Sequence, residues 1–306
     1  MWDPDDTLSH LLQPLRLRGA YVSDWHLHRG WGVRGEPEPR ALLHYMRAGN
    51  ATIRLAGQDS QRLQAGDLAI FPKGAAHVVA EGDDATPQLI DRLLPDRKPG
   101  SADVLDLGAG HRVGRMLCAG LDYEAAGAYP LYRTLPDLLL VDAEAIAADM
   151  TLSSVLTSLT TELDQRQSST RAVSLRLFEL IYVLGLRSAL KSMGTTIPIS
   201  RVLAHPAIGR VLITMYEHYD REWTISDLAS LAQMSRASFA TTFKNVVGET
   251  PARHLRHQRL ARAKNLLETT TLSQDAIARK VGYQSSVGLH LAFRAEYGTP
   301  PGAWRH

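Results

Sequence analysis

Three side chains in the first 125 residues could take part in effector binding or redox chemistry: His44, His77 and Cys118. An imidazole exchanges protons near neutral pH and can bind a metal, and a cysteine thiol can be oxidised. Cys118 is the only cysteine, so neither an intramolecular disulfide nor a cysteine metal cluster can form within one chain. These three residues are therefore our candidates for an effector or redox site.

The last hundred residues indicate a different chemistry, the recognition of double-stranded DNA. The first of two helix-turn-helix patterns lies at about 224–247. Ser226 is the expected N-cap of its first helix. The second helix, from Arg236 to Lys244, carries Phe239 and Phe243 on one face. That face can pack on the first helix, which leaves the opposite face for the major groove.

The second pattern, at about 273–296, has the same construction. Gly282 supplies the permissive backbone that a tight turn needs, and Ser285 can cap the following helix. Leu289 and Phe293 repeat the four-residue spacing of the aromatic pair in the first pattern. This internal repetition predicts two helices with outward faces of the same kind.

The outward faces of these two helices are the candidate DNA-binding surface. Arginine and lysine hold backbone phosphates, which orients a protein on DNA without reading its sequence; we expect this role for Arg236, Lys244 and Arg294. The candidate DNA-binding residues are Arg236, Ala237, Ala240, Thr241 and Lys244 in the first pattern, and Ser285, Ser286, Val287, His290 and Arg294, beside an outward Leu291, in the second.

At these positions the sequence resembles the AraC/XylS family of bacterial transcription regulators. The resemblance covers Ala204 to His306 and departs from the family at Leu289, where a phenylalanine is usual. The signature positions stand here as Ile225, Leu228, Ala229, Met234, Ser235, Phe239, Phe243, Lys244, Gly248, Pro251, Arg259, Ala263, Ile277, Ala278, Val281, Gly282, Tyr283, Phe293 and the stretch from Gly298 to Arg305.

The resemblance implies which residues read bases and where the helices lie. The implied base readers are Ala237, Ala240 and Thr241, followed by Ser286, Val287 and His290. No arginine or asparagine stands among them to bind guanine or adenine through two hydrogen bonds, so thymine-methyl contacts or DNA shape should weigh more. The two helices are expected in successive major grooves, about 10 bp apart on one DNA face.

Charge is distributed unevenly along the 306 residues. From Arg201 onward there are 14 Lys and Arg against 8 Asp and Glu, a net +6, whereas the preceding residues carry 20 against 24, a net −4. A basic C-terminal third joined to a mildly acidic remainder is typical of a polyanion-binding module fused to another domain. Within that third, the arginines of the helix expected from Pro251 to Leu267 should have buried stems and solvated head groups.

In the residues before this region, the predicted secondary structure changes from strands to helices near residue 130. Apolar spacing then predicts two helices, Met150–Gln165 and Ser169–Met193, and a linker at about 197–205. The residues from 82 to 100 are expected to form a long loop. The earlier residues favour short strands separated by turns, as in a barrel, at Tyr21–Leu27, Ala41–Met46, Ala51–Leu55, Asp67–Phe71, His77–Val79 and about 112–123.

The stretch from Gly66 to His77 resembles the second motif of the cupin barrel, with a hairpin turn at Pro72 and Gly74. Glu81 stands where the motif usually ends in asparagine. The first cupin motif supplies metal ligands as His-x-His and Glu, but residues 34–49 offer only His44, and the alternating His26 and His28 come too early. Because metal sites need three or four ligands, we expect no metal or other cofactor.

Residues 116–136 add a resemblance to the cupin sensor domain of one AraC-type subgroup, which includes regulators that respond to reactive chlorine species. Those sensors use two cysteines. Cys118 matches one of them, whereas the region around Gly19 and Ala20 offers no partner. A disulfide switch within one chain is therefore not expected, and oxidation of Cys118 alone or a disulfide between protomers stays open.

The sequence as a whole predicts a two-domain α+β protein: a cupin-like sensor barrel (1–130), a helical coupling or dimerisation region (131–200) and an AraC-type DNA-binding domain (204–306). The predicted function is a cytoplasmic transcription regulator, by family resemblance an activator, controlled by a small molecule or an oxidant. Its expected partners are promoter DNA, RNA polymerase and a second copy, with no membrane. Two alternatives are a cupin enzyme with a regulatory DNA-binding tail and a thiol redox sensor acting through Cys118.

Overall fold

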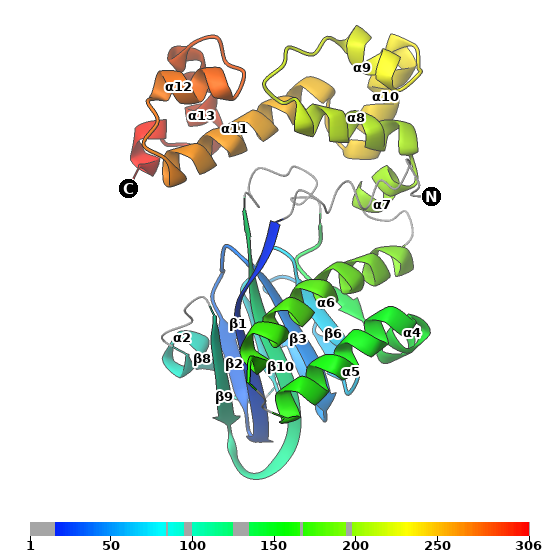
Figure 1. Ribbon diagram of the computed structural model, residues 1–306, viewed down its shortest axis with the longest axis vertical. Helices are drawn as coiled ribbons and strands as arrows, with labels where there is room; N and C mark the ends of the chain where they lie inside the picture. Colours follow the sequence, from blue (N-terminus) through cyan, green and yellow to red (C-terminus); the bar gives the residue numbers. More distant parts are fainter. Residues whose placement is uncertain are drawn as a thin grey trace. The chain divides into compact units, whose positions relative to one another are not determined.

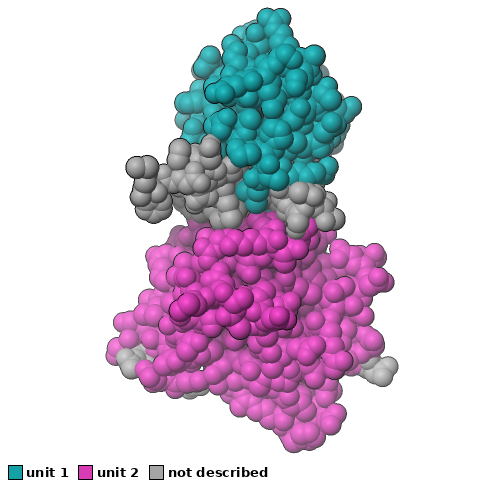
Figure 2. All heavy atoms as spheres, turned by 90° about the vertical axis from the view of Figure 1, so that its right-hand side faces the viewer, with its two compact units in different colours: residues 1–15, 125–135, 194–306 teal, residues 16–124, 136–193 magenta. Residues whose placement is uncertain are grey.

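The computed structural model describes residues 16–83, 85–94, 100–124, 135–165, 168–193 and 198–305. The chain divides into two compact units, coloured separately in Figure 2. We call residues 16–124 and 136–193 the barrel unit, and residues 198–305 the helical unit. No helix in these described ranges has both the length and the apolarity to cross a membrane.

The barrel unit is built from two sheets that enclose a core (Figure 1). One sheet has the strand order β11-β6-β3-β10-β1-β9 and the other β5-β4-β7-β2-β8. The strands are β1 (Arg16–Arg29), β2 (Gly32–Gly35), β3 (Ala41–Ala48), β4 (Asn50–Arg54), β5 (Gln61–Gln64), β6 (Leu68–Phe71), β7 (His77–Ala80), β8 (Gln88–Leu89), β9 (Ser101–Leu107), β10 (Ala109–Glu124) and β11 (Leu139–Val141).

The core of the barrel unit takes side chains from both sheets. Trp25, Met46 and Phe71 come from the six-stranded sheet, and Ile53 and Val79 come from the five-stranded sheet. All five are 3% exposed or less. Alternate residues of these strands point to the same side, so each strand contributes every second side chain to one shared interior.

Three helices follow the strands of the barrel unit in its described part: α4 (Ala143–Ala148), α5 (Met150–Gln165) and α6 (Thr170–Ser192). Helix α6 lies across the six-stranded sheet and contacts β1, β6 and β11 (Figure 1). A side chain at Gly185 would come within 2.8 Å of Leu68 and Ile70. Glycine therefore allows the helix to approach the sheet closely, although it weakens a helix interior.

The helical unit contains seven α-helices in its described part and ends in a short 3₁₀ turn. Helix α11 runs from the pair α9 and α10 to the pair α12 and α13 (Figure 1). The elements are α7 (Pro198–Leu203), α8 (Pro206–Glu217), α9 (Ile225–Leu231), α10 (Arg236–Val247), α11 (Pro251–Thr269), α12 (Gln274–Lys280), α13 (Ser286–Tyr297) and η2 (Pro301–Trp304).

The two-domain α+β prediction is confirmed, with a strand-rich region followed by a helical one, but four local predictions were wrong. The linker expected at about 197–205 contains helix α7. Residues 82–100 contain β8 and the short helix α2 (Ile90–Leu93) in addition to loop. Strand β11 was not expected after residue 130. The turn at Pro72 and Gly74 joins β6 to β7, which belong to different sheets, so it is no hairpin. Residues 125–134, part of the second cupin resemblance, lie outside the described ranges.

Candidate nucleic-acid interface and buried histidine–cysteine site

Helix α9 opens the first helix-turn-helix with a capping box. The Thr224 side chain accepts a hydrogen bond from the Asp227 N–H, while the Asp227 carboxylate accepts one from the Thr224 N–H. This arrangement satisfies two backbone donors that a helix start leaves unpaired. The prediction that Ser226 is the N-cap was wrong, because Ser226 lies inside the helix. The Thr-x-x-Asp spacing was the signal for the true cap.

Helix α10 packs its aromatic face inward, as predicted. Phe239 and Phe243 are fully buried, with ring centroids 5.6 Å apart. Ser235 caps the helix by accepting a hydrogen bond from the Ser238 N–H. On the outward side Arg236, Ala237, Thr241 and Lys244 are exposed and Ala240 is half-buried. The Arg236 Nε donates to Ser226 Oγ at 3.2 Å, which links the two helices across the turn.

Helix α13 repeats this construction in the second helix-turn-helix. Ser285 is its N-cap, as predicted, and accepts from the Gly288 N–H. Leu289 and Phe293 are buried against α11 and α12. Arg294 is exposed, whereas Ser286 and His290 are half-buried. Val287 and Leu291 are 67% and 65% exposed, so two large aliphatic side chains face outward one helical turn apart.

Helix α11 contributes to the core of each helix-turn-helix. Near its start, the ring of His254 packs edge-on against Phe243, with centroids 5.9 Å apart. Further along, Leu260, Ala263 and Leu267 join the core around Phe293. One continuous helix therefore holds both pairs of helices.

Two carboxylates and two histidines strengthen the same connection. Glu249, which precedes α11, lies 2.9 Å from His254 Nδ1 and 3.0 Å from His257 Nδ1. The Nε2 of His257 lies 3.3 Å from Glu296 on α13. Burial acts to raise the pKa of Glu249, but the hydrogen bond with His254 and the charges of the neighbouring imidazoles lower it below its usual value. His257 thus bridges the two helix-turn-helix pairs, a role that no pattern in the sequence predicts.

Two arginines of α11, Arg259 and Arg262, are half-buried and hydrogen-bonded within the protein, whereas Arg253 and Arg256 are exposed. Arg259 Nε donates to the Tyr219 carbonyl at 2.7 Å, and its terminal nitrogen donates to the Arg221 carbonyl at 2.9 Å. Arg262 donates to the Tyr216 hydroxyl at 2.6 Å and lies over its ring. These guanidinium groups fix the segment between α8 and α9.

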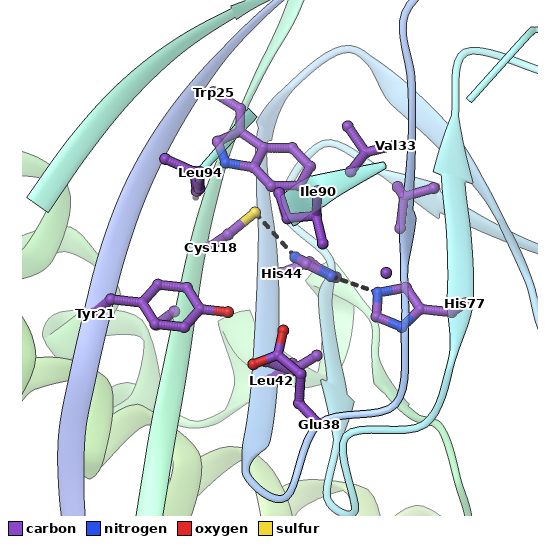
Figure 3. Close-up of a pocket in the computed structure, with 13 residues that line it drawn as sticks. Tyr21, Trp25, Val33, Glu38, Leu42, His44, His77, Ile90, Leu94 and Cys118 are labelled. Carbon is purple, nitrogen blue, oxygen red and sulfur yellow. Dashed lines mark hydrogen bonds between the residues drawn. The ribbon is translucent and has the colours of Figure 1, made fainter. Parts of the chain in front are cut away.

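In the barrel unit, the three candidate residues His44, His77 and Cys118 meet in one buried hydrogen-bonded chain (Figure 3). Cys118 on β10 pairs directly with His44 on β3, and its Sγ lies 2.9 Å from His44 Nδ1. His44 Nε2 lies 2.9 Å from His77 Nε2, and His77 Nδ1 lies 2.7 Å from the Ala75 carbonyl. The chain therefore spans both sheets.

The Ala75 carbonyl, at the end of this hydrogen-bonded series, determines the direction of each hydrogen bond in it. The Ala75 carbonyl can only accept, so His77 Nδ1 carries a proton and, in the neutral ring, Nε2 accepts. His44 Nε2 must then donate, which leaves His44 Nδ1 to accept from the Cys118 thiol. The pKa shifts agree: burial raises the pKa of Cys118 well above its usual value, lowers that of His44 and brings that of His77 to about 4.

A small cavity of about 30 Å³ adjoins this chain. Its walls are mostly apolar, and Trp25, Val33 and Ile90 face it beside the two imidazoles (Figure 3). An engineered apolar cavity that binds benzene measures about 150 Å³. The cavity in this conformation therefore admits only a very small molecule unless side chains such as Ile90 and Leu94 move.

Lowering the pH from 7 to 4 is expected to destabilise the barrel unit. An unfolded histidine takes up a proton near pH 6.5, whereas folded His77 does so at about pH 4. Between these values the unfolded chain binds more protons, so the free energy of unfolding falls as the pH falls, by roughly 3 kcal/mol for His77. Calorimetry of the barrel transition measures the effect. The variant His77→Gln should show a shallower pH dependence; an unaltered dependence would mean that His77 does not titrate as described.

Within the described ranges, no group of three or more His, Cys, Asp or Glu side chains has the arrangement of a metal site. His44 Nδ1 faces Cys118 and His44 Nε2 faces His77. His44 could therefore offer only one nitrogen to a metal near His77. These three side chains can donate or accept single hydrogen bonds in a buried interior.

Both parts of the chain match known protein families. Residues 6–191 match the family described as Cupin, and residues 228–306 match the family described as Helix-turn-helix domain. The HTH-type transcriptional regulator AlkR of Acinetobacter baylyi is 25% identical over 306 residues, covering 98% of this chain and 99% of that protein. MtrA of Neisseria gonorrhoeae, also an HTH-type transcriptional regulator, is 28% identical over 306 residues, with 98% of each chain covered.

Two further similar proteins are described in connection with a signal or with DNA. The RCS-specific HTH-type transcriptional activator RclR of Escherichia coli is 26% identical over 283 residues, with 92% of this chain and 89% of that protein covered. Among solved structures, the DNA-binding domain of AdpA in complex with a target DNA is 34% identical; the match covers 32% of this chain and 89% of that one, with a TM-score of 0.32.

Proposed function

The chain belongs to the AraC-type transcription regulators that carry a cupin domain before their helix-turn-helix domain, and on this premise we propose that α10 and α13 bind successive major grooves of promoter DNA. The supporting observation is the repeated construction. Each helix has a serine cap, buries an apolar pair and presents a cation, Lys244 or Arg294, on its outward side. A mobility-shift assay on DNA flanking its own gene tests the proposal; sequence-independent binding under all effector conditions would contradict it.

Replacing Lys244 or Arg294 by alanine is expected to weaken binding to all DNA sequences about equally, roughly tenfold for each. Each cation that neutralises a phosphate releases a counterion, so each variant should also reduce the slope of log affinity against log salt by about 0.9. Titrations at several salt concentrations measure both quantities. Arg62→Ala, an exposed change on β5 of the barrel unit, is the matched control. Lost sequence preference at an unchanged salt slope would contradict phosphate binding.

We propose that the cavity beside Cys118, His44 and His77 receives the effector, a small neutral molecule that exchanges hydrogen bonds with this chain. Its apolar walls and the neutral state of both imidazoles support this chemistry. Oxidation of Cys118 is less favoured, since the reactive form of a cysteine is the thiolate and this thiol is 2% exposed with a raised pKa. A thermal-shift screen of small molecules against the full chain tests the proposal.

We also propose that the protein is not an enzyme and that it activates transcription in the cytoplasm by contacting RNA polymerase. The names of its relatives support regulation, and one of them is named an activator. A second copy is the remaining proposed partner. Val173 and Leu180, seven residues apart on α6, are 40% and 43% exposed and could pair with the same helix of another protomer. Sedimentation of the purified chain measures its oligomeric state.

A further inference from the structure

The outward faces of α10 and α13 differ at matching positions. The two helices align with an offset of fifty residues: Phe239 matches Leu289, Phe243 matches Phe293 and Lys244 matches Arg294. At the two outward positions one turn apart, α10 carries Ala237 and Thr241, whereas α13 carries Val287 and Leu291. The same framework therefore presents small side chains in one helix and large aliphatic ones in the other.

Val287 and Leu291 are unusually exposed for their type. Their exposed fractions, 67% and 65%, are the largest among the large apolar side chains whose burial the structure describes in the helical unit, where Ile225, Leu231 and Leu272 reach 38–39%. Aliphatic surface left in water costs free energy that burial recovers. The two side chains therefore favour a partner that covers them, and their position on the proposed DNA-binding helix makes that partner a duplex.

The major groove offers one apolar group on the edges of its base pairs, the C5-methyl of thymine. The other groups that distinguish base pairs there are hydrogen-bond donors or acceptors, and an aliphatic side chain that covers one of them would leave it unpaired. Arg294 lies three residues beyond Leu291 on the same outward side and is exposed. This cation complements the phosphates that flank a groove.

We propose that Val287 and Leu291 make α13 a reader of thymine methyl groups, so that the half-site bound by the second helix-turn-helix is selected for thymines. The inference rests on the proposed DNA-binding function and specifies which bases one half of the operator contains. Ala237 and Thr241 present less apolar surface on α10 than Val287 and Leu291 do on α13, so affinity for the first half-site should depend less on thymine methyl groups.

Substitution of deoxyuridine for thymine tests this inference, because it removes the methyl group and leaves every hydrogen-bonding atom in place. An operator is first selected from random duplexes with the purified full chain. Each thymine is then replaced singly, and affinity is measured for each duplex. We expect a loss of roughly three- to fivefold per contacted methyl, the amount associated with one buried methyl-sized group, at one or two thymines in one half-site.

The double variant Val287→Ala with Leu291→Thr is the matched comparison, since it places in α13 the residues that α10 carries at the same positions. This variant should bind thymine and deoxyuridine duplexes equally, while its helix content and salt slope stay those of the parent. If no sequence is enriched in the selection, the proposed DNA-binding function fails and the inference fails with it. If an operator is found but deoxyuridine is neutral throughout, only the inference fails. If the variant binds DNA unchanged yet no longer activates transcription with RNA polymerase, the two side chains contact protein instead.

Discussion

Replacing Phe243 by alanine is expected to lower the free energy of unfolding of the helical unit by about 3–5 kcal/mol. The ring is fully buried and contacts Phe239 in its own helix and His254 on α11. Its removal leaves a cavity at the point where α10 meets α11. Since domains are typically stable by only 5–15 kcal/mol, this loss removes a substantial part of the stability that keeps the first helix-turn-helix folded.

Urea denaturation followed by far-ultraviolet circular dichroism measures this change, and Thr241→Ala provides the control. Thr241 is exposed on the same helix, and a surface substitution of this kind changes stability by about 0.5 kcal/mol or less. The Phe243 variant should unfold at clearly lower urea concentration than the Thr241 variant. Equal midpoints would show that the aromatic face of α10 is not packed inward, which would also reverse the assignment of its outward face.

Inserting 5 bp between the two half-sites of the operator is expected to reduce affinity to that for non-specific DNA, a loss on the order of 10³-fold or more. Half a helical turn moves the second half-site to the opposite side of the duplex. The helical unit cannot follow, because α11 is one continuous helix of 19 residues whose two ends belong to the two cores. The contacts of His257 with Glu249 and Glu296 further fix the two pairs of helices.

An insertion of 10 bp distinguishes a rigid arrangement of the two helix-turn-helix pairs from a flexible one. It restores the face of the duplex but moves the half-sites about 34 Å further apart, more than the roughly 28 Å length of α11 itself. We therefore expect no recovery of affinity. Recovery with 10 bp but not with 5 bp would mean that the two helix-turn-helix pairs move independently. Titration of the three duplexes with the full chain gives the answer.

The sequence predicted best the elements whose pattern is local. The apolar spacing from Met150 to Gln165 matches α5 to the residue, and the paired apolar positions in α10 and α13 correctly identified the inward faces. Each of these patterns is complete within one or two helical turns, so no distant residue is needed to interpret it. The same holds for Ser285 as a cap, whereas Ser226 was chosen where a better cap, Thr224, stood two residues earlier.

The features that the sequence did not predict depend on distant residues. Strands such as β8 and β9 are recognisable because they pair with β2 and β1, not because of their own residues. Likewise His44 and Cys118 are 74 residues apart, and only the pairing of β3 with β10 places them face to face. His44, His77 and Cys118 were each identified as candidates, but their order in one hydrogen-bonded chain required the register of two sheets.

The chain from Cys118 through His44 to the Ala75 carbonyl contains no ion, and this has a consequence for a cell under osmotic stress. Dissolved salt screens exposed charges strongly and buried neutral dipoles hardly at all. Contacts with DNA phosphates weaken steeply as salt rises, whereas hydrogen bonds to neutral imidazoles inside the barrel do not. On the functions proposed for the two sites, a rise in internal potassium should therefore weaken binding to promoter DNA while leaving effector binding in the barrel unchanged.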